Sequence, residues 1–122
     1  MEKILIVDDW VDVFKPTRKI LREDGYQVRQ VATAQEAWEK LSTSRYDIVI
    51  IDTSEDTEIK KGKCLSEILE ESFPNTLRIG WTAAAMYLTP SDIRKYHHII
   101  SKPVITDDIK KGIEEGYKRM ND

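Results

Sequence analysis

Residues 46–52 read YDIVIID, and the apolar run from Ile48 to Ile51 ends at the carboxylate of Asp52. A short β-branched run bounded by polar residues is typical of a strand that is buried on both faces. Burial on both faces in turn indicates a parallel sheet covered by helices on either side. In open sheets of this kind ligands bind at the carboxyl ends of the strands, so Asp52 is expected at a binding edge.

Four other segments are also expected to be strands, and three of them are followed directly by an acidic, hydroxyl or amino side chain. The expected strands lie at residues 3–7, 27–31, 77–81 and 99–101. Asp8 and Asp9 follow the first of these strands, Thr82 follows the third, and Lys102 follows the last. The run QVRQV at 27–31 is far more polar than the others and is therefore expected at an edge of the sheet.

Amphipathic helices are expected between the strands and after the last one. The first is predicted to begin near Pro16, or after a cap by Asp12, and to bury Ile20; the second should start after Thr33 and bury Trp38. The others are expected at residues 65–73, at 89–96 as a short helix, and after a cap by Thr106. Strands that alternate with helices in this way predict an α/β fold, a three-layer doubly wound (βα)5 parallel sheet.

Length and composition place the chain among ordinary globular proteins. Its 122 residues suit a single domain over residues 1–122, and 40% of them are hydrophobic. The formal net charge of −3 gives no reason to expect direct binding to nucleic acid or to a membrane. The single Cys64 excludes an intramolecular disulfide and a cysteine-based metal site, which suits a cytoplasmic location. No apolar run is long enough for a membrane span or a signal peptide.

The residues that follow the strands are chemically complementary, and a parallel sheet would bring them to one edge. Asp8, Asp9 and Asp52 would repel one another there unless a cation joined them. Mg²⁺ fits, because it prefers oxygen ligands and commonly binds one or two carboxylates together with water and phosphate oxygens. The hydroxyl of Thr82 and the ammonium of Lys102 would suit an anion beside the metal, such as a phosphoryl group on a carboxylate.

In these residues and in their order, the chain resembles the receiver domain of two-component response regulators, in the CheY-like superfamily. The matching residues are Asp8 and Asp9, Asp52, Thr82 with Ala83, and Lys102 with Pro103. Together they extend the resemblance over essentially the whole chain. It implies a flavodoxin-like sheet with strand order 2-1-3-4-5. It also implies that the chain is no ordinary enzyme but a switch that promotes its own phosphorylation and dephosphorylation.

The resemblance implies a role for each residue at this edge. Asp52 would accept a phosphoryl group from a sensor histidine kinase or a phosphotransfer protein, in a reaction that depends on Mg²⁺. The metal ligands would be Asp8, Asp9, Asp52 and the backbone carbonyl of Ser54. Lys102 would pair with the phosphoryl group once it is bound to the carboxylate.

The phosphorylated state would be passed on by Thr82, which moves towards the phosphoryl group, and by the switch position, here Ile99. Related domains usually have Tyr or Phe at that position, so we expect backbone rearrangement of residues 83–89 in place of a rotamer switch. The resemblance further implies a cis bond before Pro103 and control of a downstream effector or a fused output domain. The resemblance also implies that the chain could form a homodimer through the face made by the fourth helix, the fifth strand and the fifth helix.

Two other functions compete with this interpretation. The chain could signal by protein contact alone, although an unused site would have no need of its full set of acids, threonine and lysine. It could also be a phosphatase-type hydrolase, but Trp10 stands where those enzymes, with Asp-x-Asp-x-Thr, have their second Asp. His97 and His98 are expected to be solvent-exposed or helix-capping rather than phosphocarriers. Glu55 and Asp56, in the polar loop after the third strand, are interpreted as surface charge.

Overall fold

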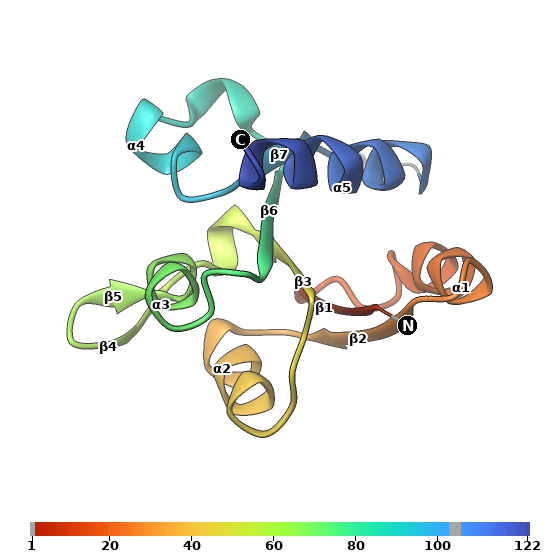
Figure 1. Ribbon diagram of the computed structural model, residues 1–122, viewed down its shortest axis with the longest axis horizontal. Coiled ribbons are helices and arrows are strands. Elements are labelled where there is room, and N and C mark those ends of the chain that lie inside the picture. Colours follow the sequence, from red (N-terminus) through yellow and green to blue (C-terminus); the bar gives the residue numbers. More distant parts are fainter. Residues whose placement is uncertain (1, 103–105) are drawn as a thin grey trace.

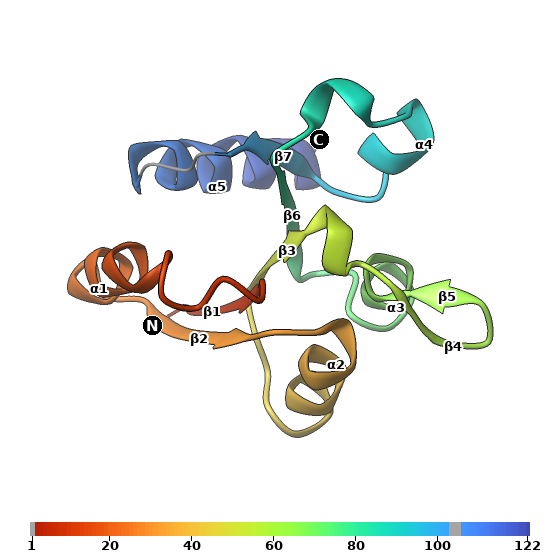
Figure 2. The same cartoon turned by 180° about the vertical axis from the view of Figure 1, so that it is seen from behind.

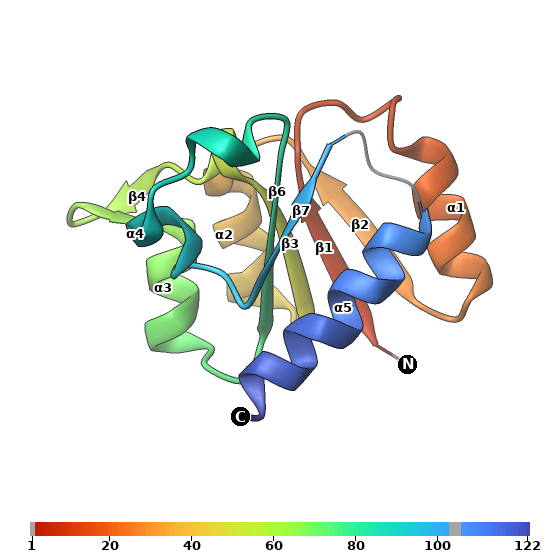
Figure 3. The same ribbon diagram turned by 90° about the horizontal axis from the view of Figure 1, so that it is seen from above.

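A five-stranded parallel sheet forms the centre of the computed structural model, which describes residues 2–102 and 106–122 (Figure 3). Its strands are β1 (Lys3–Val7), β2 (Gln27–Val31), β3 (Ile48–Asp52), β6 (Leu77–Thr82) and β7 (His98–Ser101). They lie in the order β2-β1-β3-β6-β7, with every neighbouring pair parallel. Without the two strands of a separate hairpin this is the order 2-1-3-4-5, so the predicted fold is confirmed.

Helices cover both faces of the sheet and complete the three layers (Figures 1 and 2). One face is covered by α1 (Lys15–Glu23) and α5 (Thr106–Met120), the other by α2 (Ala34–Thr43) and α3 (Leu65–Ser72). The shorter pieces are η1 (Thr53–Glu55), η2 (Ala85–Tyr87) and α4 (Pro90–Ile93); the last is short as predicted but ends at Ile93, before the expected end at Tyr96. No helix of the described ranges is long and apolar enough to cross a membrane. Pro103 and the side chain of Thr106, on which two predictions fall, lie outside the described part of the structure.

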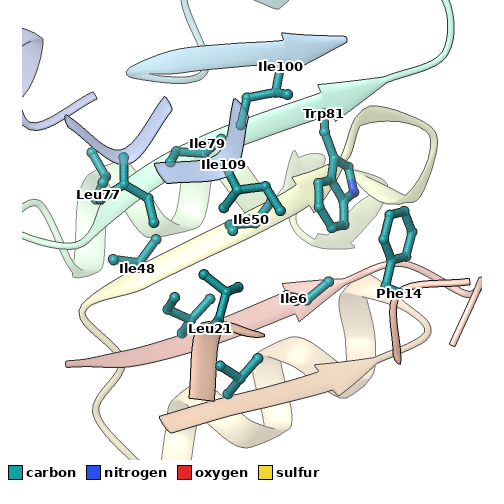
Figure 4. Close-up of a cluster of buried hydrophobic side chains, with 13 residues drawn as sticks. Ile6, Phe14, Leu21, Ile48, Ile50, Leu77, Ile79, Trp81, Ile100 and Ile109 are labelled. Atoms are coloured by element: carbon teal, nitrogen blue, oxygen red, sulfur yellow. The ribbon is translucent and has the colours of Figure 1, made fainter. Parts of the chain in front are cut away.

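The central strands are buried on both faces because their side chains alternate between two cores. In β1, Ile4 and Ile6 pack on the side of α1 and α5, whereas Leu5 and Val7 pack on the side of α2 and α3. Figure 4 shows the first of these cores, with side chains from several strands meeting those of α1 and α5. The edge strand β2 leaves Arg29 exposed, which explains its more polar sequence.

The segment after β3 carries a small β-hairpin instead of the plain loop predicted from sequence. Its strands are β4 (Glu58–Lys60) and β5 (Lys63–Cys64), and it projects from the side of α3 (Figure 1). Lys61 and Gly62 join the strands with φ angles of 53° and 75°. Two positive φ angles favour a tight hairpin, but Asn or Asp usually precedes the glycine, so the Lys-Gly pair was a weak signal. Glu58 stabilises the turn by accepting the N–H of Gly62 at 2.8 Å.

Three predictions about the helices are wrong in detail. Ile20 is 38% exposed, because α1 turns Leu21 rather than Ile20 fully towards the sheet. Trp38 is half-buried and lies edge-on to Phe73 instead of filling the core. No side chain caps the start of α1, so the cap considered for Asp12 is not formed and the helix begins next to its proline.

His97 is neither solvent-exposed nor a helix cap, contrary to the prediction. It is half-buried just before β7, where its Nδ1 accepts the backbone N–H of Arg78 at 2.9 Å. Its own backbone N–H donates to the carbonyl of Arg78 at 2.8 Å. Burial, helped by the nearby Arg78 guanidinium, lowers the pKa of His97 to about 4. A neutral His97 side chain therefore completes the pairing of β6 where β7 has not yet begun.

Two glycines allow α5 to approach the sheet closely. A Cβ atom on Gly112 would lie 2.6 Å from Cδ1 of Ile100, and one on Gly116 would lie 2.9 Å from Cδ1 of Leu77. Both distances are below van der Waals contact, so each glycine leaves room for a core side chain. Each also costs about 1 kcal/mol of helix propensity relative to alanine, which the closer packing offsets.

Gly112→Ala should destabilise the protein although alanine is the better helix former. Overpacking a core costs about 1–3 kcal/mol, against a gain of about 1 kcal/mol in helix propensity. We expect urea unfolding to show a net loss of about 1 kcal/mol, and little change for the exposed neighbour Lys111→Ala. Ile100→Val removes the clashing Cδ1, so Gly112→Ala should cost less in that background. An equal cost in both backgrounds would contradict the clash.

His97→Asn should remove part of the pH dependence of stability. The folded pKa of about 4 lies below the ordinary value of 6.5, so between these pH values the unfolded chain binds more protons and stability falls as the pH falls. A full shift of this size would weaken the fold by about 2 kcal/mol between pH 7 and pH 5, and solvent screening of the half-buried ring reduces the expected loss to about 1 kcal/mol. Asn can still accept the N–H of Arg78 but does not titrate. Urea unfolding at both pH values should therefore show a smaller loss for the variant, and equal losses would refute the role of His97.

Candidate functional site

The carboxyl ends of the strands meet at one edge of the sheet, and three charged side chains come into contact there. Asp8 follows β1, Asp52 ends β3, and Lys102 follows β7. The Nζ atom of Lys102 lies 2.7 Å from Oδ2 of Asp8 and 2.8 Å from Oδ2 of Asp52. The backbone N–H of Lys102 also donates to the carbonyl of Thr82 at 2.7 Å. Four residues that the sequence predicts at this edge are thus brought together.

This ion triad of Asp8, Asp52 and Lys102 is shielded from water. The side chain of Asp8 is 0% exposed, and those of Lys102 and Asp52 are 11% and 13% exposed. Burial alone would raise the pKa of Asp52, but hydrogen bonds from Lys102 and Ser54 outweigh it and lower the pKa. Burial likewise opposes the charge of Lys102, while its bonds to Asp52 and Asp8 prevail and raise its pKa. Asp52 and Lys102 are therefore both ionised at neutral pH.

Asp52 also organises the turn that follows it. Its Oδ1 accepts hydrogen bonds from the backbone N–H of Ser54 at 2.9 Å and from the Ser54 hydroxyl at 2.8 Å. Asp52 is thus the N-cap of η1. Because one oxygen holds the turn and the other contacts Lys102, the orientation of the carboxylate is fixed from two sides.

The other acidic side chains at this edge gather around the triad without joining it. Asp9 is exposed, and in the described ranges no three acidic, histidine or cysteine side chains are close enough to hold a metal ion. Glu55, predicted as surface charge, is half-buried. Burial raises its pKa, and the charges of Asp9, Asp52 and Asp8 raise it further. These groups all offer carboxylate oxygens, the donor type that suits Mg²⁺.

Thr82 is buried at the end of β6, and its hydroxyl is engaged with its own loop. The Oγ1 atom accepts the backbone N–H of Ala84 at 3.1 Å. No hydrogen bond in the described structure joins Thr82 to Asp52. The hydroxyl keeps its own proton available while it accepts this bond, so a movement towards Asp52 would let it donate to an anion there.

Three aromatic rings surround the ammonium of Lys102. Its Nζ lies 5.4 Å from the ring centroid of Trp10, 5.5 Å from that of Phe14 and 5.7 Å from that of Trp81. Phe14 and Trp81 stack with centroids 4.4 Å apart (Figure 4), and the ammonium is nearly equidistant from both rings. Trp10 contacts the cation from the solvent side. It is 58% exposed and forms the rim between the site and solvent.

Sequence reasoning missed a second contact beside the site, between Asp56 and Tyr96. The hydroxyl of Tyr96 donates to Oδ2 of Asp56 at 2.6 Å. Tyr96 and Thr82 line the same cavity of about 300 Å³, whereas larger cavities of about 550 and 740 Å³ lie away from the triad. The predicted switch residue Ile99 is half-buried in β7. The sequence signal for the contact with Asp56 was Tyr96, an aromatic residue three positions before Ile99. Its partner could be identified only from the three-dimensional structure.

Solved structures with this fold include several response regulators. Response regulator protein TrrA from Thermotoga maritima, in complex with Mg²⁺-BeF, is 22% identical with a TM-score of 0.76, over 95% of this chain and 99% of that one. TrrA in complex with histidine kinase ThkA is 23% identical with a TM-score of 0.73, over 95% and 98%. A CheY-like receiver domain protein from Methanospirillum hungatei JF-1 is 24% identical with a TM-score of 0.74, over 99% and 97%. No curated protein matches this chain significantly in sequence.

A family match in sequence agrees with these likenesses in fold. The family described as "Response regulator receiver domain" matches residues 4–114, most of the chain. That range contains the five strands of the central sheet apart from Lys3, the first residue of β1, and every residue of the ion triad. This chain therefore belongs to the response regulator receiver domain family.

Proposed function

We propose that this chain is a phosphoacceptor switch in which Asp52 receives a phosphoryl group. The observation that carries the proposal is the Lys102 ammonium, 2.7 Å from Asp8 and 2.8 Å from Asp52 at the carboxyl edge of the sheet. The complex of TrrA with histidine kinase ThkA supports a sensor histidine kinase, or a phosphotransfer protein, as the donor.

In the transfer, a carboxylate oxygen of Asp52 attacks the phosphorus of a phosphohistidine. A P–O bond forms while the P–N bond breaks, and the electron pair of that bond stays with the imidazole. The lowered pKa of Asp52 keeps the nucleophile ionised at neutral pH. Lys102 then exchanges its contact with Asp52 for the phosphoryl oxygens, and Thr82 moves towards them to donate a hydrogen bond.

We propose that the acidic groups at this edge, which the described structure leaves too far apart for a metal ion, draw together to bind Mg²⁺. The ligands we propose are Asp8, Asp9, Asp52 and the backbone carbonyl of Ser54. When bound, the metal neutralises charge on the phosphoryl oxygens. The gathering of carboxyl groups around Glu55 and the Mg²⁺-BeF complex of TrrA support this assignment.

The phosphorylated chain would act, in the cytoplasm, on a downstream effector or a fused output domain. NtrX from Brucella abortus has the same fold (22% identity, TM-score 0.81) in a longer chain, since this chain covers 28% of it, which supports the fused arrangement. A homodimer through α4, β7 and α5, the lack of direct nucleic-acid binding and a domain over residues 1–122 stay predictions. Signalling by contact alone is the competing function.

Acetyl phosphate with Mg²⁺ should add one phosphoryl group to the protein, as counted by intact mass spectrometry. Asp52→Asn should abolish the adduct because an amide does not replace the carboxylate nucleophile. Asp12→Asn removes an exposed acid nearby and should leave the adduct unchanged. An adduct that survives Asp52→Asn would refute this acceptor. A wild type that accepts no phosphoryl group from acetyl phosphate or from histidine kinases would favour signalling by contact alone.

Mg²⁺ should raise the Tm, because it binds the native state and not the unfolded chain. At ten times its dissociation constant the gain is about 1.4 kcal/mol. Asp9→Ala should remove most of the rise in Tm, while Asp12→Ala, a matched loss of one acid from the same loop, should keep it. Equal rises in the two variants, or no rise in the wild type at millimolar Mg²⁺, would contradict the metal assignment.

A further inference from the structure

A buried hydrogen bond beside the site has no part in the proposed chemistry. Tyr96 lies in the turn before β7, is 6% exposed, and donates its hydroxyl proton to Oδ2 of Asp56 at 2.6 Å. Burial and the charge of Asp56 raise the pKa of Tyr96 above its ordinary value, so its hydroxyl keeps its proton at neutral pH and remains a donor. The bond joins two segments that are 40 residues apart in sequence: the turn after Asp52 and the segment that leads into β7.

At one end this bond is attached to the turn that carries the phosphoacceptor. Asp56 follows η1 directly, and its second oxygen, Oδ1, accepts the backbone N–H of Ser66 in the first turn of α3 at 2.9 Å. Asp52 caps the other end of η1 through Ser54. The turn is therefore held at both ends by acidic side chains. A displacement of this turn has to move Tyr96 or break its bond to Asp56.

At the other end, the ring of Tyr96 occupies a space that the sheet leaves for it. A Cβ atom on Gly80 of β6 would lie 3.0 Å from two atoms of the ring, so glycine permits this position. Gly80 is paired with Ile99 of β7, the position at which the family usually has an aromatic residue. In this chain the ring therefore comes from three residues earlier and packs into the core on the side of α2 and α3.

The rearrangement expected of Thr82 leads to the same ring. Thr82 is bonded to the N–H of Ala84, and both residues line the cavity of about 300 Å³ together with Tyr87, Leu88 and Tyr96. When the Thr82 hydroxyl turns towards Asp52, the Ala84 N–H is released and the segment that follows can move into this cavity. A displacement of the turn after Asp52 and a movement of Thr82 would thus both affect the surroundings of Tyr96.

We infer that the Tyr96–Asp56 hydrogen bond is a tether that couples the state of Asp52 to the segment between α4 and β7. It takes the place of a side-chain switch at Ile99. Tyr96 and Asp56 are positioning residues, because their bond lies outside the ion triad and acts through the turn that Asp52 caps. The inference rests on the proposed function, since phosphorylation of Asp52 is the input.

The test compares backbone amide chemical shifts of the wild type, Tyr96→Phe and Tyr87→Phe, each with and without beryllofluoride and Mg²⁺. Phe fills the space beside Gly80 but cannot donate to Asp56, and Tyr87, 80% exposed, loses the same hydroxyl close by. We expect shifts at residues 53–56 in all three proteins. Shifts at residues 95–99 should appear in the wild type and in Tyr87→Phe and fall by more than half in Tyr96→Phe.

Equal shifts at residues 95–99 in all three proteins would overturn the tether. If Tyr96→Phe does not fold, Asp56→Ala removes the same bond from its other end and should give the same loss. If beryllofluoride and Mg²⁺ cause no shifts at residues 53–56 of the wild type, the proposed function is overturned instead. The spectra without these ligands then test the tether. In those spectra Tyr96→Phe should shift the amides of Asp56 and Ser66 and Tyr87→Phe should not; unshifted amides in both would refute it.

Discussion

The contact of one ammonium with two buried carboxyl groups is the interaction on which the arrangement of the site depends. Asp8 and Asp52 come from adjacent strands, whereas Lys102 follows β7, which is separated from β3 by β6. Its long side chain therefore spans one strand to reach them. Removing one partner of a buried ion pair typically costs about 3–5 kcal/mol, because the other charge is left without compensation. The triad thus fixes the strand ends against one another and at the same time places the carboxylate of Asp52 beside a cation.

The triad can form because the sheet beneath it is rigid and covered on both faces. Alternating side chains of β1 and β3 fill two separate cores, so the direction of each strand end is determined by packing on either side. Close approach of α5 at Gly112 and Gly116 holds the helix against β6 and β7. The stacked rings of Phe14 and Trp81 close the core next to Lys102.

The segments that join the strands to the helices are less regular than the sheet itself. The hairpin after η1 and the single turn of α4 lie on the side of the sheet away from α1 (Figures 1 and 3), and Tyr96, which bonds to Asp56, packs into the core on that side. Such segments have few buried apolar contacts of their own and open more readily than core strands. The contacts of Asp56 link these segments to the turn that Asp52 caps.

Local sequence pattern was sufficient for the parallel sheet and most of the site, whereas the strand order was implied by the resemblance to receiver domains. An apolar run such as that at 48–51 has one suitable environment, a strand buried on both faces, and parallel strands place their carboxyl ends at one edge. Asp8, Asp52, Thr82 and Lys102 were predictable for this reason. The hairpin was not predictable, because its turn has the usual glycine, Gly62, but Lys61 in place of the Asn or Asp that normally precedes it.

Tertiary structure alone decided which side chains meet. Asp8 and Asp9 both follow the end of β1, yet only Asp8 enters the triad, while Asp9, next in sequence, is left exposed. The bond between Asp56 and Tyr96 spans 40 residues and depends on the space beside Gly80. Local patterns report whether a residue is buried and in which element it lies, but a contact between distant segments exists only after both have packed on the same sheet.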